Sequence, residues 1–315
     1  MKNWNAISDG NFSEVSARDR AFGLADKGTF TELLGPRDRF YSPHLPVLGT
    51  AIEFDDGLVS GIGLFEKHPL FINSMEGRFI GGAIGEVNGA KLVMSLRLAL
   101  ETYDMIDKAE LEERRPLAVI SFETGGVRLH EANAGLLAHA EIMDAIQDLR
   151  GKVPVIAIIG SKIGCFGGMG FVAAATDVVI MSEIGRLGLT GPEVIEQEVG
   201  KEEFDATDKS LVYRTTGGKH KYITRDCNYL VEDKVSAFRE KIGAVSRLPI
   251  QEIESLRKVG SHELVQKQID FVNSVATSGA NDAKELWAMY GNQKPDRLPD
   301  MELCDFLSTV KRRPL

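Results

Sequence analysis

Short apolar runs alternate with amphipathic stretches through the middle of the chain. The runs LAVISFE, VIAIIG and DVVIMS are apolar almost throughout, and each is followed by turn residues. Runs of this kind predict strands that are buried on both faces and covered by helices. The pattern therefore predicts an α/β fold. Because the spacing of the runs is irregular, a spiral of strand-strand-helix units fits it better than a regular barrel.

The two ends of the chain differ from this middle part. Residues 1–50 are predicted to form a helical N-terminal segment, with one helix over about 13–27 and a short one over about 30–34. Residues 51–200 form the predicted core. Residues 201–315 are polar and charged with helical periodicity, which predicts a helical C-terminal extension.

Several elements are expected inside the core. LVSGIGLF and PLFINSM predict a hairpin joined at EKH, and a glycine-rich turn then leads into a long helix that ends near residue 107. A second helix is predicted over about 129–149, a third through about residue 173, and a short strand at RLGLT.

Size and charge narrow the class of protein. With 315 residues and 43% hydrophobic content, the chain can bury a large core. A net charge of -9 argues against nucleic-acid binding, which depends on clustered Lys and Arg. No apolar run approaches the roughly 20 residues that span a bilayer, and the N-terminus lacks a signal-peptide core. We expect a cytoplasmic protein without a nucleic-acid or membrane partner.

Common catalytic motifs are absent from the sequence. GIGLFE lacks the third glycine of a dinucleotide fingerprint, and NGAK and GGKH lack the ending of a P-loop. GSKIG is not a nucleophile elbow, because the serine directly follows the first glycine. The three cysteines and the carboxylates show no metal-ligand spacing, so no metal is expected.

Two glycine turns each stand between a predicted strand and a predicted helix. The first contains Gly125 and Gly126, and the second contains Gly167 and Gly168. Each alone is either a tight turn that needs positive φ or a set of backbone N–H groups presented to an oxygen. The two together predict an oxyanion hole for the enolate of a thioester. Loss of one such donor typically costs about 3 kcal/mol of transition-state stabilisation.

Side chains in and after these turns have two possible roles each. Arg128 either anchors a carboxylate or phosphate or forms a salt bridge to an acid such as Glu131. His130 is either a proton donor or a structural residue at a helix start. Cys165 is either an activated nucleophile or a small buried residue.

Three segments resemble a known family. GGAIGEVNGAKL, SFETGGVRLHEANAGL and the stretch from PVIAIIG to IEQEVG are similar to the carboxyltransferase branch of the crotonase superfamily. FETGGVRLHEAN, GPEVIEQEVG and TTGGKH resemble the β subunits of biotin-independent malonate decarboxylases more closely. The resemblance covers about residues 13–233 and implies a crotonase-like fold.

The resemblance also implies a reaction and its partners. A malonyl thioester on the phosphopantetheine-like, dephospho-CoA-derived arm of an acyl carrier protein would lose CO2 to give the acetyl thioester. A homologous γ subunit would complete the site, and this chain would bind neither biotin nor another cofactor. The site residues expected in the matched segments are Gly125, Gly126, Gly167 and Gly168 for catalysis and Gly81, Gly82, Arg128, Phe166 and Met169 for substrate binding.

Two departures from the family pattern and two alternatives stay open. Carboxyltransferases usually have Gln where His130 stands, and the zinc ribbon of the bacterial acetyl-CoA carboxylase subunit is missing. One alternative is the carboxyltransferase subunit of a biotin-dependent acyl-CoA carboxylase or biotin-dependent malonate decarboxylase. The other is a non-catalytic scaffold subunit whose glycines serve only folding.

Overall fold

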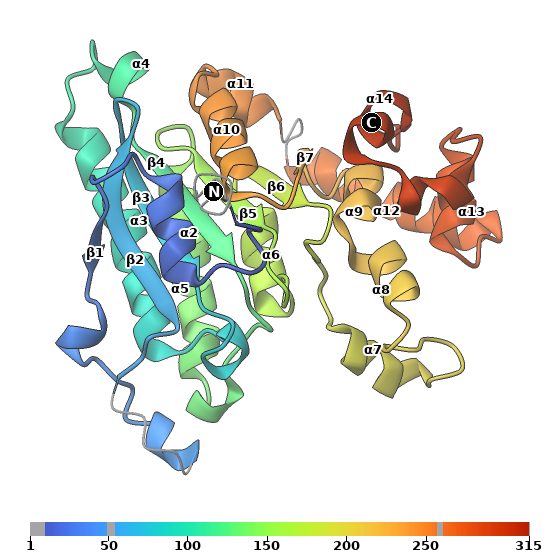
Figure 1. Ribbon diagram of the computed structural model, residues 1–315, viewed down its shortest axis with the longest axis horizontal. Helices are drawn as coiled ribbons and strands as arrows, with labels where there is room; N and C mark the ends of the chain where they lie inside the picture. Colours follow the sequence, from blue (N-terminus) through green and yellow to red (C-terminus); the bar gives the residue numbers. More distant parts are fainter. Residues whose placement is uncertain (1–9, 49–53, 257–260, 315) are drawn as a thin grey trace, which may run out of the picture.

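A seven-stranded sheet with its strands in sequence order organises the chain (Figure 1). The computed structural model describes residues 10–48, 54–256 and 261–314. The strands are β1 Thr31–Leu33, β2 Leu58–Phe65, β3 His68–Met75, β4 Leu117–Phe122, β5 Val155–Ile159, β6 Val178–Ser182 and β7 Tyr229–Val231. The β1, β2 and β3 strands pair antiparallel, and β3 through β7 pair parallel. The predicted α/β class is confirmed.

Helices cover both faces of this sheet. The covering helices are α2 Ala17–Leu24, α3 Glu86–Met105, α5 Ala134–Leu149, α6 Gly168–Ala175 and α10 Val235–Ser246. Along β4, Leu117 and Val119 face the core shared with α2 and α10, whereas Ala118 and Ile120 face the core shared with α3 and α5. Because consecutive side chains alternate across a strand, one apolar run supplies both cores.

The remaining helices are short or lie in the C-terminal half. They are α4 Leu111–Arg114, α7 Pro192–Val199, α8 Lys209–Thr216, α9 Gly218–Thr224, α11 Ile250–Ser255, α12 Ser261–Ser278, α13 Ala283–Met289 and α14 Leu303–Thr309. Most of them lie beyond the β7 edge of the sheet (Figure 1). Among the described residues no helix is long and apolar enough to cross a bilayer.

The predicted hairpin is confirmed. Phe65 pairs with His68, so only Glu66 and Lys67 lie in the turn between β2 and β3. Glu66 has a φ of 54°, the left-handed conformation that such tight connections require. The long helix predicted to end near residue 107 is also present, as α3.

Several predicted elements differ in the structure. The segment predicted as a helix over 30–34 is strand β1, because its backbone pairs with Ser60–Ile62 at the sheet edge. The helix predicted over 129–149 is divided into a 3-10 turn, η4 Leu129–Glu131, and α5, since Ala132 has a φ of 50°. RLGLT forms isolated bridges rather than a strand.

The sheet extends beyond residues 51–200 at both ends. Strand β1 comes from the N-terminal segment, and strand β7, which the sequence pattern did not predict, comes from the C-terminal one. Helix α10 packs with α2 on the same face, so it belongs to the core layer rather than to an appended extension.

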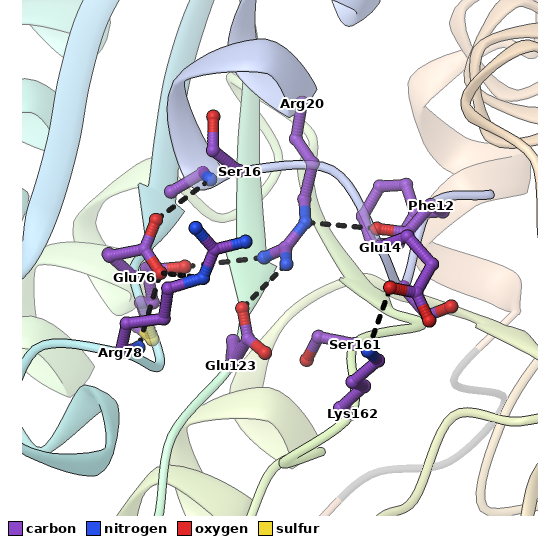
Figure 2. A network of polar contacts seen from close by, with 12 residues as sticks. Phe12, Glu14, Ser16, Arg20, Glu76, Arg78, Glu123, Ser161 and Lys162 are labelled. Carbon is purple, nitrogen blue, oxygen red and sulfur yellow. Dashed lines mark hydrogen bonds and ion pairs between the residues drawn. The ribbon is translucent and has the colours of Figure 1, made fainter. Parts of the chain in front are cut away.

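A buried ion pair ties α2 to the end of β4 (Figure 2). Arg20 Nη2 donates to Glu123 Oε2 at 2.6 Å, and Arg20 is 2% exposed. The same guanidinium donates to the carbonyl oxygens of Phe12 and Met75 at 3.1 and 3.3 Å. Its charge is thus satisfied by one carboxylate and two carbonyls, which a buried guanidinium needs.

Replacement of Arg20 should show how much the ion pair with Glu123 contributes to the free energy of unfolding. We expect Arg20→Met to lower the free energy of unfolding by about 3–5 kcal/mol, because it leaves the Glu123 carboxylate buried without its cation. Denaturant unfolding followed by circular dichroism measures this loss.

The exposed pair between Lys162 and Glu14, at 2.8 Å in the same region, supplies the control. Lys162→Met should cost less than about 1 kcal/mol, because solvent screens that pair. Equal losses in the two variants would contradict the role assigned to Arg20.

Candidate active site

The two predicted glycine turns lie against each other. Beyond the strand ends, the chain continues into a small second ladder in which Thr124 pairs with Cys165 and Ile84 pairs with Val127. Phe166 N donates to Thr124 O at 3.0 Å, which fixes the second turn beside the first. The parallel order of β4 and β5 therefore brings both turns to the same end of the sheet.

Glycine is required where the two backbones touch. A Cβ on Gly126 would lie 3.1 Å from Gly167 Cα, and one on Gly167 would lie 3.0 Å from Gly126 Cα. Both residues have positive φ, at 116° and 61°. Glycine is therefore needed at both positions, because each has positive φ and because the two backbones approach each other closely.

Three of the four glycines that were expected to offer free N–H groups donate to other groups of the protein. Gly125 N donates to Gly81 O at 3.0 Å, and Gly167 N donates to Leu189 O at 2.9 Å. Gly126 N donates to Thr124 Oγ1 at 3.0 Å. In this conformation these three glycines shape the turns, and their N–H groups are already engaged, which corrects the donor roles expected for them.

Several N–H groups in these turns lack an acceptor in the described part of the chain. Two of them belong to Gly168, the first residue of α6, and to Val127. Ile84 N donates to Gly126 O and Arg128 N donates to Ile84 O, so the parallel pairing directs Val127 N away from Ile84. A Cβ on the adjacent Gly126 would be 3.5 Å from Gly168 N.

Val127 is the residue that the sequence analysis missed. A search for glycines finds the turns, but an N–H is available only where the ladder leaves it unpaired. The position of Val127 directly after the glycine pair is the feature of the sequence that could have identified it. Met169, the second residue of α6, also has an N–H without an acceptor among the described residues.

Arg128 does not reach a substrate. It is fully buried, and its Nη1 lies 2.7 Å from Asp55 Oδ2 and 3.0 Å from Glu131 Oε1. Its Nη2 donates to Ala83 O at 3.0 Å. The structure therefore shows the salt-bridge alternative for Arg128 and gives no support to the predicted substrate-binding role.

Glu131 extends this buried cluster to another helix. Its Oε2 accepts a hydrogen bond from Glu86 N at 2.6 Å, at the start of α3. A carboxylate at this position satisfies one of the unpaired N–H groups of the first helical turn and interacts favourably with the helix dipole. Arg128 thus connects the first glycine turn to the N-terminus of α3.

The other predicted binding residues lie around the turns in different environments. Gly81 is exposed and accepts the Gly125 N–H, whereas Gly82 is buried with its Cβ position 1.7 Å from Glu123 O. Phe166 and Met169 are 4% and 0% exposed, so their side chains pack in the core. A bound molecule could reach the backbone of these residues but not the Met169 side chain.

Cys165 is a buried residue. Its thiol is 0% exposed, and burial raises its pKa far above the ordinary value, so the reactive thiolate does not form near neutral pH. Burial raises the pKa of Cys227 to about 12, whereas Cys304 is exposed. His130, the middle residue of η4, is exposed.

A cavity of about 560 Å³ adjoins the second turn. Its lining includes Gly170 and Phe171 of α6, together with Gly188 and Leu189. It also includes the cationic side chains Arg150, Lys221 and Arg225 and the carboxylates Asp177, Asp226 and Glu254. Among the described residues, no cluster of His, Cys, Asp and Glu is arranged to hold a metal ion.

The two positive-φ glycines Gly81 and Gly82 form a matched test of the packing. Gly81→Ala should cost about 1–2 kcal/mol from its φ of 63°, because nothing lies within 4 Å of its Cβ position. Gly82→Ala should cost a further 1–3 kcal/mol or so, because the methyl group meets the Glu123 carbonyl. Unfolding free energies measure the difference, and a difference of zero would refute the close approach.

Alkylation of the native protein checks the cysteine environments. At pH 8 iodoacetamide should modify Cys304 and leave Cys165 and Cys227 intact, since both buried thiols have raised pKa values. Peptide mass spectrometry before and after denaturation identifies the modified residues. Rapid native modification of Cys165 would show that the second turn opens to solvent.

Comparisons with known proteins show the family to which the chain belongs. The sequence profile of the carboxyl transferase domain matches residues 14–281. The chain is 59% identical over 315 residues to the malonyl-S-ACP:biotin-protein carboxyltransferase MADC of Malonomonas rubra, and the match covers 99% of each chain.

Solved structures show the same fold. A Pseudomonas malonate decarboxylase hetero-tetramer, crystallised with malonate, contains a chain with 35% identity and a TM-score of 0.77, covering 89% of this chain and 97% of that one. Transcarboxylase 12S, at 22% identity and a TM-score of 0.61 over 77% of this chain and 43% of its own, shares the fold alone. The chain therefore belongs to the carboxyl transferase domain family and has the crotonase-like α/β fold that its sequence predicts.

Proposed function

We propose that this chain is the subunit of a malonate-decarboxylating complex that cleaves a malonyl thioester carried by an acyl carrier protein. The observation that carries the proposal is the pair of N–H groups, on Val127 and Gly168, that lack acceptors on two adjacent turns. Unengaged backbone donors at the start of a helix stabilise negative charge.

The reaction follows from this arrangement. The thioester oxygen accepts hydrogen bonds from Val127 N and Gly168 N, and the bond between the α-carbon and the carboxyl carbon breaks. The electron pair moves into an enolate, whose oxygen gains charge where the donors lie. Protonation of the α-carbon then gives the acetyl thioester. This chemistry needs charge stabilisation and no nucleophile, in keeping with the buried Cys165.

The acceptor of the carboxyl group separates two versions of the proposal. The full-length relative at 59% identity is named for transfer from malonyl-S-ACP to a biotin protein, which favours biotin on a partner protein as the acceptor. Direct release of CO2 without biotin, which the sequence resemblance implies, is the second candidate. The similarity to the Pseudomonas malonate decarboxylase supports decarboxylation and does not distinguish the two acceptors.

A partner subunit is part of the proposal. Large apolar side chains are exposed on η4, α5, α6 and the loop after β6, close to both glycine turns. They are Leu129 (79%), Leu136 (57%), Leu137 (61%), Phe171 (58%) and Leu189 (59%). A patch of this kind fits a protein interface. We assign it to a homologous γ subunit, since the structural relatives are hetero-oligomers.

The carrier arm has a suitable place beside this patch. The cavity along α6 combines apolar residues with the cations Arg150, Lys221 and Arg225 and the carboxylates Asp177, Asp226 and Glu254, and this mixture suits a flexible arm that has both apolar and phosphate groups along its length. Under the proposal, the phosphopantetheine-like arm of the acyl carrier protein occupies it and delivers the thioester to the turns.

A direct assay tests the reaction and its acceptor. The complex isolated with its partner subunits is expected to convert malonyl-carrier protein into acetyl-carrier protein. In the biotin version, avidin blocks turnover. In the second version, CO2 is released at the same rate with or without avidin. A complex that leaves malonyl-carrier protein unchanged would refute the proposal.

Substitution of a turn glycine separates catalysis from scaffolding. Gly126→Ala should lower turnover by about 100- to 1000-fold in an intact complex, because the added methyl group pushes the two turns apart and misplaces their donors. Gly200→Ala is the control, since Gly200 also has positive φ (92°) but has open space around its Cβ position. Unchanged turnover in Gly126→Ala would favour the scaffold alternative.

A further inference from the structure

A buried histidine packs against Gly168, whose N–H group is unengaged among the described residues. His139, on α5, is 5% exposed, and its Nδ1 lies 2.5 Å from Gly135 O. Its Nε2 has no hydrogen-bond partner in the described part of the chain. A buried ring nitrogen without a partner is uncommon and calls for an explanation.

The unpartnered nitrogen faces the start of α6. A Cβ on Gly168 would lie 3.0 Å from His139 Nε2 and 2.7 Å from its Cδ2. Only glycine fits between this ring and the second turn. The imidazole therefore packs against the residue that carries an unengaged N–H group.

The Gly135 carbonyl fixes the protonation pattern of the ring. A carbonyl oxygen only accepts, so Nδ1 carries a hydrogen and donates it, and Nε2 is the nitrogen that gains or loses a proton. Burial lowers the pKa of His139, whereas the hydrogen bond to Gly135 raises it. An anion beside Gly168 would favour the protonated ring, because opposite charges attract strongly at a buried site.

We propose that His139 donates the proton that converts the enolate into the acetyl group. The Nε2–H bond breaks, a C–H bond forms at the α-carbon with the electron pair of the enolate, and solvent returns a proton to Nε2 before the next turnover. The ring left behind is the neutral form with hydrogen on Nδ1, which the Gly135 carbonyl stabilises. The inference rests on the proposed function, since it requires an enolate at Gly168.

Exchange of methyl hydrogens tests this step without decarboxylation. A residue that protonates the enolate also removes a proton from the acetyl thioester in the reverse direction. The assembled wild-type complex in D2O should therefore exchange the methyl hydrogens of acetyl-pantetheine for deuterium, as followed by mass spectrometry. Absence of exchange in a wild-type complex that cleaves malonyl-pantetheine would overturn the role of His139 and leave the proposed function standing.

Two histidine variants give the test its control. His139→Asn keeps a donor for the Gly135 carbonyl but removes Nε2, so exchange should fall at least 100-fold while assembly and thioester affinity remain. His130→Asn, at an exposed position, should exchange at the wild-type rate. Wild-type exchange in His139→Asn overturns the inference, and loss of exchange only in His130→Asn transfers the role to His130.

A spectroscopic measurement on the wild-type complex tests the same proposal if the His139→Asn variant does not assemble. Nitroacetyl-pantetheine, whose nitronate mimics the enolate, is added to wild-type complex labelled with ¹⁵N in histidine. Nε2 of His139 should become protonated while Nδ1 stays protonated. A ring whose Nε2 remains unprotonated in the bound complex would overturn the inference. Absence of malonyl-pantetheine cleavage in the wild-type complex would instead refute the function on which it rests.

Discussion

Buried ion pairs hold the first glycine turn at both ends, and the site depends on them. Glu123, directly before the turn, is neutralised by Arg20 of α2 at 2.6 Å. Arg128, directly after it, is held by Asp55 and Glu131 at 2.7 and 3.0 Å. Desolvation of these charges is costly, and only close pairing with further hydrogen bonds offsets it. The four residues between Glu123 and Arg128 are therefore held at both ends and have little freedom to move.

This rigidity matters because the turn is unfavourable by itself. Gly126 has a φ of 116°, and Val127 N has no acceptor within the described residues. An N–H without a partner costs free energy that the rest of the fold must supply. Under the proposed function, this donor is already oriented when the thioester arrives, and no reorganisation is needed as charge develops.

Local sequence pattern predicted the sheet strands near the site but not its donor atoms. Apolar runs identified β4, β5 and β6, because a strand buried on both faces needs apolar residues at every position. Strands β1 and β7 have three residues each and depend on pairing with the rest of the sheet, so no local pattern marks them.

Contacts between distant residues explain what the sequence left open. Arg128 could have faced substrate or an acid, and the answer depends on Asp55, which lies 73 residues away. From the sequence, the N–H groups of Gly125 and Gly167 could have been free donors. In the structure they donate to the carbonyl oxygens of Gly81 and Leu189. The glycine pairs predicted where the candidate site lies, whereas the three-dimensional pairing of N–H groups determines which of its donor atoms remain free.

The attachment of α2 has a consequence for how the protein is made. Ser13 donates from its N and Oγ to the Asp233 carboxylate at 3.0 and 2.7 Å, across 220 residues. Arg20 reaches Glu123 across 103 residues. During synthesis, the segment that contains α2 therefore completes these contacts only after residue 233 has emerged from the ribosome. Contacts between residues so far apart in the sequence slow folding, so the ion pair that holds the glycine turn forms later than the local contacts of the turn.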